Sequence, residues 1–106
     1  MTVGNISIAK DFSRYPAGRF VEDGPAPGEL CRTKVLVPAF AKYEVVSVDL
    51  DGTLGYGSSF LEETFGGLVR VEGFTGAELH KRLKLVASDQ SVIDEIWGYV
   101  DSAVRQ

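Results

Sequence analysis

The chain has 106 residues, of which 44% are hydrophobic and 25% charged, the composition of one ordinary globular domain. Its formal net charge of -4 and its pI of about 4.9 argue against nonspecific binding to nucleic acid or to an anionic membrane, because both need a basic surface. One cysteine and one histidine exclude an internal disulfide and the usual zinc sites, so we expect a single domain over residues 1–106 with no metal and no cofactor.

The sequence also predicts where the protein works. It contains no apolar run of the roughly 18 residues that a membrane helix needs. The first residues lack the basic and apolar regions of a secretory signal. Together with the single cysteine, these features predict a cytoplasmic protein with no membrane contact.

The first half of the chain predicts a strand, a long loop and a helix. Polar and apolar residues alternate over 5–9, which indicates a short strand. Glycine and proline are frequent in 13–28, so this segment predicts a loop with at most a short extended piece at 19–21. Apolar residues have helical spacing in 29–42, although Pro38 predicts a kink or an early end near Val37.

The clearest strand is 44–50, whose Val-Val-Ser-Val run is typical of a central strand covered on both faces. A glycine-rich turn follows at 52–57. We then expect a helix from Ser58 or Ser59 to about residue 70, because Ser59 and Glu62 have the spacing of a capping box.

Three further elements complete the pattern. Thr75 and Glu78 form a second capping box ahead of a short helix that ends at about Arg82. Residues 83–87 predict a strand, and a regular apolar stripe predicts a last helix from Ser91. The alternation of strands and helices predicts an α/β fold, in which a mixed sheet of about four strands packs against helices.

Residues 48–54, Val-Asp-Leu-Asp-Gly-Thr-Leu, are similar to the first motif of haloacid-dehalogenase-type phosphatases. In those enzymes the first aspartate, here Asp49, is a nucleophile and the second, here Asp51, a general acid or base beside magnesium. In this chain, however, a strand and a helix precede the motif, and no later pair of aspartates completes a magnesium site. We therefore rank the phosphatase third and expect no catalytic residue.

The stretch from Val45 to Leu61 resembles the core of the STAS domains, which are typified by antagonists of bacterial anti-sigma factors. Asp49-Leu50 matches a step at the end of the family's strand, and Ser58-Ser59 matches its double serine at a helix start. Gly57 stands where the family has aspartate, and Phe60 where it has glycine.

Over about 5–104 the chain resembles a more specific relative, the STAS-like domains of unknown function. The blocks that carry this resemblance are 18–20, 23–25, 28–29, Arg32, 49–52, 55–63 and 65–68. The resemblance implies one small sheet with helices against it.

In the regulatory STAS proteins the first serine of the pair accepts a phosphate from a partner kinase, and the resemblance gives this position to Ser58. It implies a non-enzymatic bacterial regulator or adaptor whose protein partner is of the ATPase-type kinase class. The alternative interpretation is that Ser58 and Ser59 only cap a helix. The residues assigned to the partner-binding or phosphorylation surface are Ser58, Ser59, Gly57, Tyr56, Asp49 and Asp51.

A second candidate site is the loop that precedes the first helix. It carries Arg19, Asp23, Glu29 and Arg32, and its two arginines have the chemistry to bind the phosphate of a nucleotide or another small ligand. The competing interpretation is an internal salt-bridge network that pins the loop. No P-loop or GxGxxG spacing is present, so ligand binding here ranks second.

Overall fold

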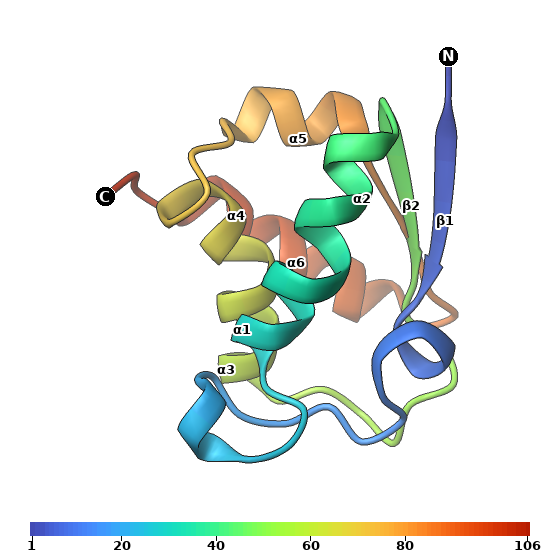
Figure 1. The fold of residues 1–106 in the computed structure, drawn as a ribbon, viewed down its shortest axis with the longest axis vertical. Helices are drawn as coiled ribbons and strands as arrows, with labels where there is room; N and C mark the ends of the chain where they lie inside the picture. The colour runs from blue at the N-terminus through green and yellow to red at the C-terminus, as the bar shows by residue number, and fades with distance from the viewer.

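Three parallel strands form the sheet of the computed structural model, which describes residues 1–106. The strand order is β1 (Val3–Ser7), β2 (Val45–Asp49) and β3 (Leu83–Val86), so β2 is central and the other two are edges. Figure 1 shows β1 and β2 along one side of the molecule and the helices beside them. The protein therefore consists of two layers, a small sheet and a layer of helices.

Helical segments connect the parallel strands, as parallel pairing requires. After β1 the chain forms two short turns, η1 (Ile8–Phe12) and η2 (Val21–Asp23). The first long helix then runs without interruption through α1 (Gly28–Cys31), η3 (Arg32–Leu36) and α2 (Val37–Lys42) to reach β2.

A second long helix follows β2, and it consists of α3 (Ser58–Leu61), η4 (Glu62–Gly66) and α4 (Gly67–Arg70). The short helix α5 (Gly76–Arg82) leads into β3, and α6 (Gln90–Ser102) packs back against η4. None of the helices combines the length and the apolar character needed to cross a membrane.

Side chains of the strands alternate between the helical layer and an open face. Val46 and Val48 of β2 are fully buried, whereas Asp49 is exposed. The open face carries two rows of register partners, Asn5 with Ser47 and Lys84, and Ser7 with Asp49 and Val86. The prediction that β2 is an interior strand is confirmed, but the prediction that both its faces are covered is wrong.

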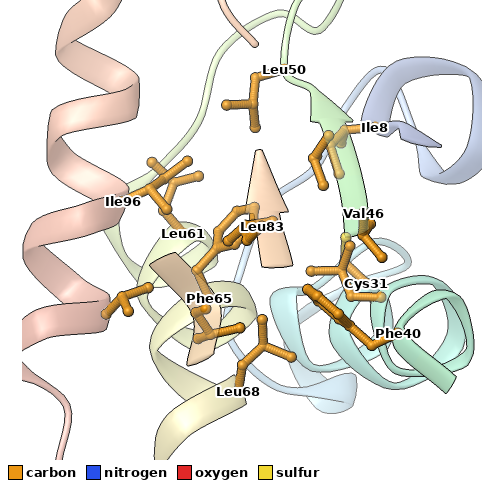
Figure 2. Close-up of a cluster of buried hydrophobic side chains, with 14 of the residues drawn as sticks. Ile8, Cys31, Phe40, Val46, Leu50, Leu61, Phe65, Leu68, Leu83 and Ile96 are labelled. Carbon is orange, nitrogen blue, oxygen red and sulfur yellow. The ribbon is translucent and has the colours of Figure 1, made fainter. Parts of the chain in front are cut away.

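The core lies between the sheet and the two long helices. In Figure 2, Val46 and Leu83 from the strands and Cys31 and Phe40 from the first helix meet side chains of the second helix and of α6. The largest fully buried side chains there are Phe60 and Phe65. Burial of these apolar groups is the main favourable contribution to folding.

The sheet has three strands, all parallel, where the sequence predicted a mixed sheet of about four. The extended piece expected at 19–21 does not join the sheet, because its amides bond locally. The carboxylate of Asp23 accepts hydrogen bonds from the amides of Arg19 and Phe20, at 3.0 and 2.8 Å. Such side-chain bonds compete directly with strand pairing.

Two further predictions about helices differ from the structure. Of the kink or early end predicted near Val37, the early end is wrong, since the helix continues through Pro38 to Lys42, with the π-helical segment η3 directly before it. The residue before the second long helix is Gly57, and no side chain caps this helix. The capping box predicted for Ser59 and Glu62 is therefore wrong.

The second predicted capping box is confirmed. Thr75 accepts a hydrogen bond from the amide of Glu78 at 3.0 Å, and the carboxylate of Glu78 accepts from the amide of Thr75 at 3.5 Å. The first strand occupies 3–7 instead of 5–9, since Ile8 is buried in η1.

Candidate functional site

The start of the second long helix is open to solvent. Ser58 and Ser59 are the first two residues of α3, and both are exposed. Because the preceding Gly57 has no side chain, the amides of the first turn have no side-chain cap. The prediction that Ser58 lies exposed at a helix start is confirmed, while the prediction that it or Ser59 caps the helix is wrong.

The loop between β2 and α3 presents an apolar side chain beside this helix start. Leu54 is 84% exposed. Its amide donates a hydrogen bond to the carbonyl of Arg14 at 3.0 Å, and the next residue, Tyr15, is 68% exposed. This backbone bond brings two exposed side chains from different segments, Leu54 and Tyr15, near each other, and the loop that carries Leu54 leads into the helix that begins with the serines.

Tyr56 anchors this loop instead of extending from it. Its hydroxyl donates a hydrogen bond to the carbonyl of Leu50 at 2.6 Å, and its ring stacks on Phe60 with 5.8 Å between centroids. Burial raises the pKa of Tyr56 to about 12. We predicted Tyr56 as a partner-binding residue; the structure gives it a role in fixing the loop.

The two aspartates of the loop are bonded locally. Asp49 lies on the open face of the sheet and accepts a hydrogen bond from the amide of Asp51 at 2.9 Å. Asp51 in turn accepts from the amide and the hydroxyl of Ser88, at 2.9 and 2.8 Å, and these bonds lower its pKa. These contacts tie the loop after β2 to the residues that follow β3. No group of three or more histidine, cysteine, aspartate or glutamate residues is placed to hold a metal ion.

The charged residues of the earlier loop form a network with the second long helix. Arg19 donates to Glu62 at 2.5 Å and to Glu63 at 3.1 Å. Arg70 reaches the same two carboxylates, with a shortest contact of 2.5 Å to Glu62. Burial by itself would raise the pKa of Glu62, but the hydrogen bonds from Arg70 and Arg19 outweigh it and hold that pKa below its ordinary value.

The centre of the network is buried. Arg32 and Glu63 are 3% and 4% exposed and form an ion pair, and Arg32 also donates to the Glu63 carbonyl at 2.9 Å. The same guanidinium donates to Glu72 at 2.9 Å. Every buried side-chain nitrogen and oxygen of the protein has a hydrogen-bond partner, so the network is complete without a ligand.

The two acidic residues predicted for the ligand loop also bond within the chain. Asp23 accepts from two backbone amides of its own loop, and Glu29 accepts from the amide of Val21 at 3.0 Å. This geometry favours the internal network over the ligand site. Binding of a nucleotide by Arg19 and Arg32 stays a prediction.

The structure brings both predicted sites to one helix, since Ser58 begins it and Glu62 lies one turn further on. Sequence reasoning missed Leu54 and Tyr15, although an apolar residue inside a glycine-rich turn is a detectable signal. It also missed the carboxylates that pair with Arg19, because nothing in the local sequence links residue 19 to residue 62.

One family matches the chain. It is described as a STAS-like domain of unknown function, and the match covers residues 28–92, which is more than half of the chain and includes both long helices, β2 and β3. No curated protein and no solved structure matches the chain.

Proposed function

The chain belongs to the STAS-like domains of unknown function, and from this premise we propose that it is a non-enzymatic bacterial regulator or adaptor that binds a protein partner. The binding surface consists of Leu54, Tyr15, Ser58 and Ser59, and we call it the docking surface. A cytoplasmic location and an ATPase-type kinase as partner belong to the same proposal. The resemblance to the regulatory STAS proteins supports this class of function, and the exposure of these residues supports the choice of surface.

The exposure of Leu54 carries the proposal. Isolated exposed apolar residues are common, but this one sits on a loop that Tyr56 and Ser88 hold in place. A fixed loop loses little conformational freedom on binding, so an apolar contact made by Leu54 contributes nearly its full value to affinity. Tyr15 adds an aromatic side chain of the kind enriched at interfaces.

Ser58 supplies a means of regulation. A phosphate on its hydroxyl adds about -1.5 to -2 charges next to the free amides of a helix start, where negative charge is favourable for the domain itself. An acidic partner would meet this charge in the contact, and like charges across an interface cost several kcal/mol. Phosphorylation is therefore expected to release the partner without unfolding the domain.

The experiment compares partner binding by wild type, Leu54→Asp, Ser58→Asp and Ser58→Ala. The partner is first captured from the native host with the wild-type chain and then purified for affinity measurement. Leu54→Asp and Ser58→Asp should each weaken binding about tenfold or more, because both place a carboxylate in the contact. Ser58→Ala should bind normally and resist phosphorylation.

Val104→Asp is the matched control, because Val104 is 77% exposed and makes the same change of charge. It lies next to the carboxyl end of the chain, which Figure 1 places at the left of the molecule, away from the light-green loop over 51–57 that runs along the bottom. All variants should keep the wild-type melting temperature. Equal affinity of wild type, Leu54→Asp and Ser58→Asp would overturn the proposed surface.

A further inference from the structure

The outer edge of β1 has free backbone groups. The carbonyl of Thr2 accepts a hydrogen bond from the amide of Val45 at 3.0 Å, so even-numbered residues of β1 direct their backbone groups toward β2. The odd-numbered residues Val3, Asn5 and Ser7 therefore direct theirs outward. The carboxylate of Asp11 already accepts from the amide of Ser7 at 2.7 Å. Val3 and Asn5 thus leave two N–H and two C=O groups outside the ladder.

These four groups are self-complementary. In an antiparallel pair about a two-fold axis, Val3 of one chain lies opposite Asn5 of a second copy, and Asn5 opposite Val3. Each of these pairs exchanges two hydrogen bonds, which uses all four free groups of each chain. Gly4 then faces Gly4 of the copy at the axis. On the helical face, the ring of Tyr43 occupies the place where a β-carbon of Gly4 would stand.

The residues of β1 itself do not oppose such pairing. Its sequence, Val-Gly-Asn-Ile-Ser, contains no proline and no charged residue, which are the usual means of protecting an edge. Figure 1 shows β1 running along the outside of the molecule, with η1 only at its lower end. The bond between Ser7 and Asp11 limits the free edge to residues 3–5.

The opposite edge of the sheet provides a contrast. The carbonyl of Val86 in β3 accepts from the amide of Leu50 at 2.8 Å, so Lys84 and Val86 face β2 and Leu83 and Leu85 face outward. An antiparallel pair of β3 strands that used the backbone groups of both Leu83 and Leu85 would place Lys84 opposite Lys84 of the copy. Like charges directly opposite are destabilising, so this edge is protected where β1 is not.

We propose that β1 pairs antiparallel with β1 of a second copy of this chain, which joins two three-stranded sheets into one of six strands. We assign the partner strand to a second copy for two reasons. After a two-fold rotation, the free N–H and C=O groups of one β1 face the free C=O and N–H groups of the other, and β1 carries no charge that would repel the copy. The contact is short, so the dimer is weak and forms only at high concentration. The pairing is independent of the docking surface, since it uses residues 3–5 alone.

Sedimentation velocity of the full chain from micromolar to millimolar concentration tests the proposal. The sedimentation coefficient should rise with concentration. In an equal mixture of 13C-labelled and unlabelled chains, filtered NMR experiments should show an intermolecular contact between the α-protons of Gly4 and of its copy, because residues at this position of an antiparallel pair lie about 4.5 Å apart.

Val3→Lys should weaken the association about threefold, because it brings two ammonium groups to diagonal positions across the axis. The double variant Val3→Lys/Asn5→Lys places them directly opposite and should weaken it about tenfold or more. Val86→Lys is the matched control for Val3→Lys. The two valines are 49% and 48% exposed on the same face, at opposite edges, and the control should associate as wild type does.

Circular dichroism and urea unfolding check that each variant is folded before association is compared. The proposal is overturned by a constant monomer sedimentation coefficient of wild type over the whole concentration range. It is equally overturned by a dimer that lacks the Gly4 contact, or by one that Val86→Lys weakens as much as Val3→Lys does.

Discussion

Two loops that lie against the same helix are held in different ways. The loop over 13–27 is bound by the ion pairs of Arg19 and by the hydrogen bonds that Asp23 accepts. The loop over 50–57 has no ion pair; it is fixed by the hydroxyl of Tyr56 and by the bonds between Asp51 and Ser88. Only the second loop presents an almost fully exposed leucine, Leu54.

The difference shows that charged residues in a glycine-rich loop are weak indicators of a binding site. Arg32 has the chemistry of a phosphate ligand, but its donors already bind Glu63 and Glu72. Separating a buried guanidinium from its carboxylate costs about 3–5 kcal/mol, which a ligand at Arg32 would have to offset. Leu54, by contrast, stays exposed on a loop that hydrogen bonds fix, so it is free to contact a partner in the proposed function.

The largest expected effect is on thiol reactivity. Cys31 is fully buried near the charged network, and burial raises its pKa to about 12 from an ordinary value of 9.0. In Leu54→Cys, a thiol reagent near neutral pH should label the introduced thiol at least about a thousandfold faster than Cys31. The thiol of Cys31 becomes accessible to the reagent only when the protein unfolds locally or globally. Comparable rates at the two positions would show that the helix around Cys31 opens so often that burial does not protect its thiol.

The same thiol gives the sign of a pH effect. Its raised pKa means that the folded state keeps Cys31 protonated where the unfolded chain ionises. The resulting contribution to stability is complete below pH 9.0 and is lost as the pH rises toward about 12. Cys31→Ala should lack this part of the alkaline decline in the free energy of unfolding.

The next largest effect is on stability. Glu63→Leu leaves the guanidinium of Arg32 buried beside an apolar group and should lower the free energy of unfolding by about 3 kcal/mol, measured by urea denaturation. The double variant Arg32→Met/Glu63→Leu should recover most of this loss, because no charge is then left buried without its partner. A cost below about 1 kcal/mol for Glu63→Leu alone would contradict the buried network.

A smaller effect is expected at the rim of the network. Arg19→Ala should cost at most about 1 kcal/mol, because the pair with Glu62 is partly exposed and screened by solvent. Since the pKa of Glu62 is lowered in the folded state, the stabilisation is present above the ordinary glutamate pKa and is lost as the pH falls through the lowered one. Urea titrations of both chains at neutral and acidic pH measure the difference.

Arg19→Ala should also bind the partner with wild-type affinity, whereas Leu54→Asp should not. Lys34→Ala, at an exposed position of the first long helix, serves as a control for the lost positive charge. If Arg19→Ala abolished binding without a loss of stability, the charged loop and not the docking surface would be the contact. A thermal shift by nucleotides that depends on Arg19 and Arg32 would support the ligand hypothesis instead.

No effect is expected in the phosphatase assay. The chain with Mg²⁺ should not hydrolyse generic phosphoesters, because Asp49 lies on the open face and the oxygens of Asp51 accept bonds from Ser88. Asp49→Asn should therefore leave the background rate unchanged. Measurable turnover by wild type that disappears in this variant would contradict the proposed non-enzymatic function.

Local signals in the sequence predicted most elements of the fold. The apolar run before Asp49 predicted the central strand, the Thr75 and Glu78 spacing predicted the start of α5, and the double serine marked an exposed helix start. The errors have a common cause. Ser59 and Glu62 fit a capping box locally, but Glu62 binds two arginines that are distant in sequence. The helix also begins at Ser58 with Gly57 as its N-cap residue, so Ser59 lies inside the first turn and not at the capping position.

The sequence by itself determined the α/β class, the family and the exposure of Ser58, since these depend on periodicity, motif and turn residues over short distances. Only the tertiary structure decided that Arg19 and Arg32 face inward, that Leu54 stays uncovered and that one face and two edges of the sheet remain open. The physical reason is that ion pairing and burial depend on segments some forty residues apart, such as Arg19 and Glu62. Chain folding sets these distances, and no local pattern encodes them.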